Sequence, residues 1–166
     1  MNGFKAHLQN SGTYSSGTDD LSLTNGAYRL ILWKTLLTTS KGWELDAASG
    51  ALYARTPGLK MFRGFLWCSA GLTAGGVNTV KITLGGDVAN LVTQDGADVD
   101  AAVNYAAGTG AEAGRGGFPF GGMANMAAGN FVRVWYWGTG AGSITVNGHL
   151  AHSMFEAIDN GGGYSY

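Results

Sequence analysis

The stretch "GNFVRVWYWGTGAGSITVNG", residues 129–148, decides the fold class of this chain. Alternate side chains of a β-strand point to opposite faces, so Val132, Val134 and Tyr136 would share one face. The other face would carry three aromatic residues and one cation: Phe131, Arg133, Trp135 and Trp137. The glycine-rich residues 138–142 then predict a hairpin turn into a second strand, "SITVN". The stretch therefore predicts antiparallel β-structure with two largely apolar faces, both of which need to be covered.

Glycine divides the rest of the chain into short segments of strand length. The sequence has 29 glycines and only 2 prolines, and helical periodicity is nearly absent. Segments that alternate in hydrophobicity or are rich in strand-forming residues are 27–39, 42–46, 50–55, 59–69, 77–86, 88–93, 118–128, 130–137, 143–147 and 149–158. This rhythm predicts an all-β sandwich or barrel of antiparallel strands.

The stretch "DGADVDAAVNYAAGTGAEAGRGG", residues 95–117, is expected to form a loop. One short strand is expected around "AAVNYAA" (101–107), and an alanine-rich turn of helix is the alternative. The three aspartates at 95–100 lack the spacing and the distal glutamate of a calcium-binding loop. These aspartates are therefore expected to stabilise a turn.

The first 26 residues are rich in Ser, Thr, Gly and Asn, with isolated apolar residues among them. This composition predicts an extended N-terminal arm that is either mobile or held by a partner. The expected anchors of the arm are Phe4, Leu8, Tyr14 and Leu21. The predicted organisation is an arm (1–26), one domain (27–158) and a C-terminal tail (159–166).

Composition excludes several classes of partner. Only 13% of the residues are charged, whereas about a quarter is usual, so part of the surface is expected to lie against another chain. The net charge of −1 leaves no basic stripe for direct nucleic-acid binding. No apolar run approaches the ~20 residues that span a bilayer, and no signal-peptide pattern opens the sequence. Cys68 is the single cysteine and is expected to be a buried, unreactive thiol.

The sequence offers little that points to catalysis. His149 and His152 would lie on opposite faces of a strand, so a shared metal is not expected. "GTGAG" (138–142) joins two predicted strands and does not open a helix, so it does not predict a phosphate-binding loop. No nucleophile elbow is present. The chain is therefore predicted to be no enzyme, with no cofactor and no metal. A stacking platform for sugars or bases, such as Trp67 near Arg63, is the alternative to core or subunit contact.

The order of segments from residue 24 to 158 resembles the TNF/C1q-like jelly roll, particularly as found in bacteriophage virion proteins. Three stretches carry the resemblance: "LTNGAYRLILWKTLL" (23–37), "GWELDAASGALYARTPGLKMFRGFLWCS" (42–69) and "MAAGNFVRVWYWGTGAGSITVNGHLAHSMFEAI" (126–158). In the second stretch, Asp46, Tyr53, Pro57 and Phe62 stand where the family has an aspartate, an aromatic, a proline and a bulky residue. In the third, Asn130 replaces the usual aspartate, and Met154 and Phe155 match a final pair of bulky residues.

The resemblance implies a homotrimer around a threefold axis. It places the strand 130–137 and the final strand 149–158 together in the inner sheet, with Val132, Val134 and Tyr136 filling the sandwich. The residues implied for the trimer interface are Phe131, Arg133, Trp135, Trp137 and Met154. The second apolar face of the 130–137 strand would then be covered by sister subunits.

The resemblance favours a capsid decoration (cement) protein of a phage. Such a protein would bind the outside of the major capsid protein lattice at threefold or quasi-threefold positions and stabilise the head. The expected location is the outer capsid surface of the virion, after synthesis in the host cytoplasm, with no membrane partner. The alternative is the receptor-binding head of a tail or head fibre that recognises host surface polysaccharide. A secreted C1q-like lectin is a third class, against which the missing signal pattern counts.

Overall fold

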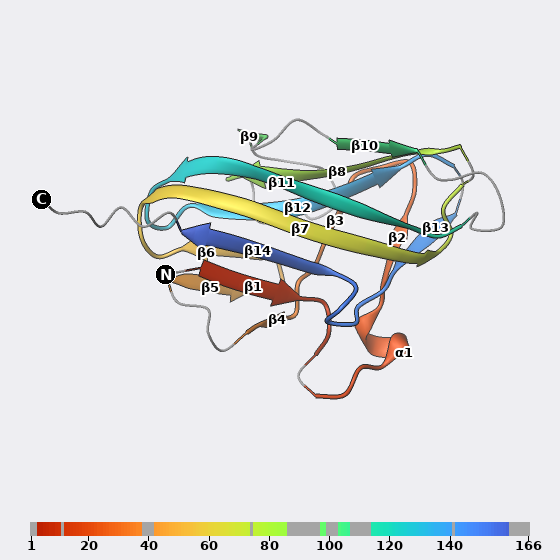
Figure 1. Ribbon diagram of the computed structural model, residues 1–166, viewed down its shortest axis with the longest axis horizontal. Helices are drawn as coiled ribbons and strands as arrows, with labels where there is room; N and C mark the ends of the chain where they lie inside the picture. The colour runs from red at the N-terminus through yellow and green to blue at the C-terminus, as the bar shows by residue number, and fades with distance from the viewer. Residues whose placement is uncertain are drawn as a thin grey trace, which may run out of the picture.

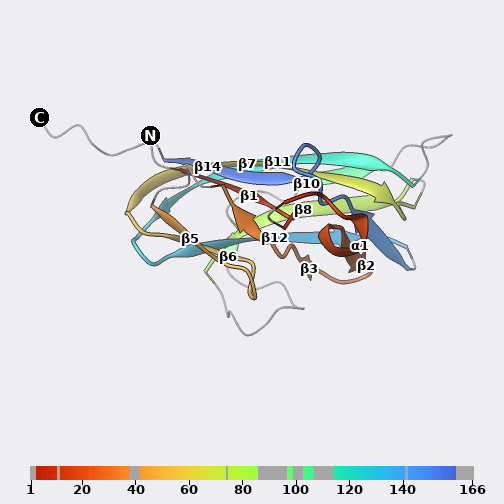
Figure 2. The same ribbon diagram turned by 90° about the horizontal axis from the view of Figure 1, so that it is seen from below.

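Two antiparallel β-sheets pack face to face in the computed structural model, which describes residues 3–10, 12–37, 42–73, 75–85, 97–98, 103–106, 114–140 and 142–159 (Figures 1 and 2). Sheet A has the order β2 (Leu21–Thr24), β13 (Ser143–Val146), β7 (Gly58–Ala70), β14 (Met154–Asp159), β1 (Gly3–His7) and β4 (Thr35–Leu36), and β11 (Gly116–Met126) pairs with β7. Sheet B has the order β10 (Val103–Ala106), β8 (Val77–Leu84), β12 (Phe131–Gly138), β6 (Ala51–Ala54) and β5 (Trp43–Asp46); β3 (Arg29–Leu30) pairs with β12 and β9 (Ala97–Asp98) with β8. The predicted antiparallel β-sandwich is confirmed.

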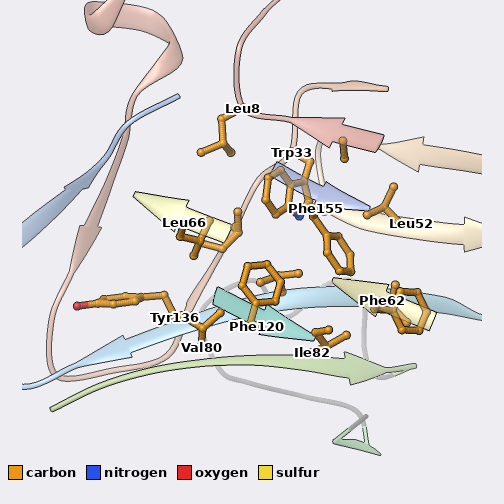
Figure 3. Close-up of a cluster of buried hydrophobic side chains, with 14 of the residues drawn as sticks. Leu8, Trp33, Leu52, Phe62, Leu66, Val80, Ile82, Phe120, Tyr136 and Phe155 are labelled. Carbon is orange, nitrogen blue, oxygen red and sulfur yellow. The ribbon is translucent and has the colours of Figure 1, made fainter. Parts of the chain in front are cut away.

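The inner face of sheet A alternates large and small side chains across its strands. Phe120, Gly64, Phe155 and Ala6 form one row from β11 to β1, and the next row runs Gly122, Phe62, Ala157 and Phe4. A Cβ on Gly64 would lie 2.2 Å from the Phe120 ring, so only glycine leaves room for the two rings beside it. The rings of Phe120 and Phe155 pack 5.6 Å apart (Figure 3). Close packing of this kind fixes how the two sheets sit on each other.

The strand β12 lies in sheet B with the predicted alternation. Val132, Val134 and Tyr136 are fully buried and belong to the core, as expected. The Tyr136 hydroxyl donates to Asn78 Oδ1 over 2.7 Å. This bond satisfies a polar group that burial would otherwise penalise.

The predicted hairpin after this strand is wrong. β12 pairs with β8, β6 and β3 of sheet B, whereas β13 pairs with β2 and β7 of sheet A. The glycine-rich turn therefore carries the chain from one sheet to the other. Gly140 and Gly142 take positive φ values there, a conformation that glycine adopts without strain. Alternation predicts that a strand exists, but it does not say which sheet the next strand joins.

The segment 27–39 also crosses between the sheets and does not form one strand. β3 pairs with β12 of sheet B, and six residues later β4 pairs with β1 of sheet A. Between them Trp33 is fully buried and stacks on Phe155 with 5.7 Å between ring centroids (Figure 3). Trp33 thus fills space between the two sheets at the point where the chain crosses from one to the other.

The N-terminal residues are part of the sandwich, so the predicted extended arm is wrong. β1 pairs with β14 on one side and β4 on the other, and β2 pairs with β13. Phe4 and Leu8 are 4% and 0% exposed and lie in the core, and Leu21 is half-buried against it. Phe4 and Leu21 therefore contact the chain's own core from positions on β1 and β2, and Leu8 does so directly after β1. Tyr14 lies between these two strands, outside the core.

Other predicted segments are found with shifted ends. The short strand expected around 101–107 corresponds to β10, and the alternative helical turn is not formed at 103–106. The segment 149–158 begins with a turn closed by His152 N donating to His149 O (2.8 Å), and only β14 is strand. The segment 88–93 and the tail after Asp159 lie outside the described residues.

Candidate functional site

Four residues of the predicted trimer interface lie on β12, in sheet B, and they differ in exposure. Arg133 and Trp135 have no exposed surface in the single chain. The Trp135 indole Nε1 donates to Thr83 Oγ1 (2.8 Å), and the Arg133 guanidinium lies over the Phe131 ring, 5.1 Å from its centroid. Phe131 and Trp137 are half-buried. A sister subunit could contact Phe131 and Trp137 directly, whereas Arg133 and Trp135 would support such a contact only from beneath.

Met154, the fifth predicted interface residue, lies on the other sheet. It pairs with Phe65 of β7 in sheet A, so the expectation that 130–137 and the final strand share a sheet is wrong. The structure therefore does not bring the five residues together. Met154 instead belongs to a different surface, the outward face of β11, β7, β14 and β1, which is called the outer face of sheet A below.

Two apolar rows cross the outer face of sheet A. One row consists of Met123, Met61 and Ile158 on β11, β7 and β14, and the other of Pro119, Phe65 and Met154 on the same strands. Met123 is 59% exposed and Met61 41%. Leu59, at the next outward position of β7, is 42% exposed. Half of the large hydrophobic side chains that are exposed among the described residues therefore lie on this one face.

A charged row lies between the two apolar rows. Lys5 of β1 pairs in register with Glu156 of β14, which pairs with Arg63 of β7. Arg63 Nε forms an ion pair with Glu156 Oε1, and the Glu156 side chain is only 15% exposed. Opposite charges directly across a sheet stabilise it. The two apolar rows thus flank one central row whose charges alternate in sign.

The sequence contained a signal for this face. On β7, "GLKMFRGFLWCS" places Leu59, Met61, Phe65 and Trp67 at alternate positions, and the opposite set is the core set Phe62, Leu66 and Cys68. The segment 59–69 thus has two apolar faces, as the segment 130–137 does. Periodicity treats the two strands alike, and only the sheet order shows that the second face of β7 stays exposed.

A polar network holds residues 9–20 to the β13–β14 connection at one end of the sandwich. The Tyr14 hydroxyl donates to Asp20 Oδ1 (2.7 Å) and accepts from Asn147 Nδ2 (2.9 Å), and Gly148 N donates to the same Asp20 oxygen (2.8 Å). Asp19 accepts from Asn10 N and Ser15 N, which lowers the pKa of its carboxyl group. This network holds Tyr14 in place. Of the four predicted arm residues, Tyr14 and Leu21 are the two that keep exposed surface.

Tyr14→Phe is expected to lower the free energy of unfolding by about 0.5–1.5 kcal/mol, because the hydroxyl mediates two hydrogen bonds. Denaturant unfolding measures this loss, and amide exchange should speed up in residues 9–20. Tyr53→Phe is the matched control, since the Tyr53 ring packs on Phe131 (5.1 Å) and its hydroxyl bonds to no described residue. Equal losses in the two variants would mean that the network does not hold this segment.

Reactive groups on the described part of the chain are few. Burial raises the pKa of the Cys68 thiol to about 12, so the expected buried thiol is found and it stays protonated at neutral pH. His149 and His152 lie 5.2 Å apart, ring to ring. No group of three or more His, Cys, Asp or Glu that could hold a metal occurs among the described residues. The same residues include no helix long and apolar enough to cross a membrane.

Comparison with known proteins shows the fold. No family model matches the chain, and no curated protein matches its sequence. Among solved structures, Eiger TNF from S. frugiperda superposes with a TM-score of 0.62 at 9% sequence identity, covering 96% of this chain and 92% of that one. Murine APRIL superposes with a TM-score of 0.58 at 8% identity, covering 95% and 99%. The chain therefore has the TNF-like jelly-roll fold predicted from its sequence.

Proposed function

We propose that this chain is a non-enzymatic structural protein that forms a homotrimer through the outer face of sheet A and decorates the outside of a phage capsid. The observation that carries the proposal is the pair of exposed apolar rows on that face. Monomeric proteins rarely expose contiguous apolar surface of this kind, and such a patch marks an interaction site.

The face has the chemistry of a subunit contact. Full burial of a methionine or phenylalanine side chain is worth about 1.5–3 kcal/mol. Met61, Met123, Phe65, Met154 and Ile158 all retain surface in the single chain. Partial burial of these five side chains would therefore contribute several kcal/mol per subunit. The trimeric count follows from the resemblance to the TNF/C1q-like jelly roll.

The capsid role rests on the resemblance to virion proteins and on the multivalency of a trimer. A trimer on a threefold position presents three copies of every contact to the major capsid protein, and linked weak contacts add up to high avidity. Of the four residues proposed for capsid contact, Phe4 and Leu8 lie in the core. The contact is therefore assigned to surface near Tyr14 and Leu21. The proposed location is the outer capsid surface, after synthesis in the host cytoplasm.

Binding to capsids tests the proposal. Purified protein is mixed with expanded capsids that lack it, and bound protein is measured after sedimentation. The expected result is saturable binding at a fixed ratio to the major capsid protein. Met61→Lys, designed to be monomeric, is expected to bind about 100-fold more weakly because it loses avidity. Failure of the trimeric protein to bind expanded capsids would contradict the capsid role.

One observation favours the receptor-binding alternative. Tyr14, His149 and His152 form a contiguous, partly exposed set of rings, with centroid separations of 5.3 and 5.2 Å. Sugar rings pack on exposed aromatic faces of this kind. Copy number separates the two functions, because hundreds of copies per virion support decoration, whereas a few dozen support a fibre head with host polysaccharide as its ligand.

A further inference from the structure

We propose that His7 makes assembly through the outer face of sheet A sensitive to acid, because its protonation releases β1 from β14. The inference rests on the proposed self-association and adds its regulation. His7 is the last residue of β1 and is paired with Met154 of β14 and Thr35 of β4. β1 also contributes Gly3 and Lys5 to the rows of the outer face.

The His7 ring is buried with one nitrogen unsatisfied. Only 2% of the residue is exposed. The ring hydrogen-bonds to the backbone of Ser153, and Nδ1 has no hydrogen-bond partner. The neutral ring therefore donates from Nε2 and leaves Nδ1 as a bare acceptor. Protonation would place a second N–H, and a positive charge, at a buried position with no acceptor, which is costly.

The charged groups around the ring oppose each other. Burial has the largest effect and lowers the pKa of His7 from its usual 6.5, and Lys5 on the same strand lowers it further. Glu156 on β14 raises it, but this carboxylate also pairs with Arg63. On the β4 side the neighbour in register is Thr35, and the nearby Lys34 ammonium donates to Thr18 O. Together these effects lower the pKa of His7, so the folded chain favours the neutral ring.

Acid therefore favours states in which β1 has left the sheet. A released His7 takes up its proton near pH 6.5, whereas the seated one resists it. The stabilisation is thus complete above pH 6.5 and is lost as the pH falls toward the lower pKa of the folded state, by about tenfold in the equilibrium constant per pH unit. A chain with β1 released loses the strand that supports β14 at the ends of both apolar rows. It also loses Lys5 from the charged row. Such a chain would not assemble.

The test compares wild type, His7→Gln and His152→Gln from pH 8 to pH 5. Glutamine keeps a donor near the Nε2 position and does not titrate, and His152 is an exposed histidine with the same substitution as control. Native mass gives the oligomeric state, and amide exchange, corrected for intrinsic rates, reports release of residues 3–7. In wild type and His152→Gln, β1 exchange and the dissociation constant of the trimer are expected to rise as the pH falls below 6.5, by up to about tenfold per pH unit, whereas His7→Gln shows neither rise.

Two outcomes overturn the inference. One is a wild type whose β1 exchange and dissociation constant do not change between pH 6.5 and pH 5, and the other is a His7→Gln variant in which both change as much as in wild type. A wild type that is monomeric at pH 8 overturns the proposed assembly instead. Amide exchange of residues 3–7 in that monomer then shows whether His7 protonation releases β1. If His7→Gln does not fold, exchange at the imidazole C2 position of wild type measures the His7 pKa directly. A value at or above 6.5 overturns the inference.

Discussion

Met61→Lys is expected to convert the proposed trimer into a folded monomer. Met61 lies at the middle of one apolar row, between Met123 and Ile158, and is 41% exposed in the single chain. A lysine at this position can reach solvent in the monomer, so the fold is retained. In the trimer it would place one unpaired charge per subunit inside an apolar contact, which costs several kcal/mol each. Three such charges raise the dissociation constant by several orders of magnitude.

Native mass spectrometry and unfolding measurements check this prediction together. The variant should show the mass of one chain and keep its β-sheet circular dichroism. Val77→Lys is the matched control because Val77 is also 41% exposed but lies on β8 of sheet B. The control should remain trimeric. If Val77→Lys dissociated and Met61→Lys stayed trimeric, the contact would lie on sheet B, where the interface residues of β12 implied by the resemblance lie.

Phe155→Ala is expected to lower the free energy of unfolding by about 3–5 kcal/mol, enough to unfold much of the protein near 37 °C. Phe155 is fully buried at the centre of an aromatic cluster (Figure 3). Its ring centroid lies 5.1 Å from that of Phe4, 5.7 Å from Trp33, 5.8 Å from Phe62 and 5.6 Å from Phe120. Removal of the ring leaves a cavity that joins β1, β7, β11 and the crossing segment, none of which can close it alone.

Denaturant unfolding of the variant measures the loss, with Phe131→Ala as the matched control. Phe131 is half-buried on the outward side of sheet B, where its ring packs on Tyr53 and on the Arg133 guanidinium. Its removal is expected to cost about 1–2 kcal/mol, since much of the space it leaves opens to water. If Phe155→Ala were no more destabilising than Phe131→Ala, the cluster would not be the centre of the core.

Sequence periodicity predicted strands well because each strand keeps its own alternation. The residues of 130–137 divide between the two faces as expected, and β7 and β11 lie within one or two residues of their predicted ends. The N-terminal residues give a weak strand signal because only a small residue, Ala6, and two polar residues lie between Phe4 and Leu8. A polar outer face and a disordered arm have the same composition over so few residues.

The sequence predicts that the chain has apolar surface beyond its core, but it does not predict which sheet carries that surface. Low charge and a strand with two apolar faces correctly indicated that more apolar surface exists than one core can bury. On β12, Trp135 is covered and hydrogen-bonded to Thr83 within its own chain, whereas the exposed apolar rows lie on sheet A. Which strand keeps an uncovered face depends on the order of strands in the sheets. That order is set by long-range pairing, such as β14 between β7 and β1, and local patterns do not encode it.

Oxidation of Met123 in the native wild-type protein tests the central claim most directly. This side chain is 59% exposed in the single chain and lies on the outer face of sheet A. Peroxide labelling with mass-spectrometric readout is carried out at a concentration where native mass shows the oligomer, and again after dilution. Assembly through this face predicts slow oxidation of Met123 in the oligomer and faster oxidation on dilution. Oxidation of Met123 at the rate of an open methionine in a trimeric sample would contradict the account.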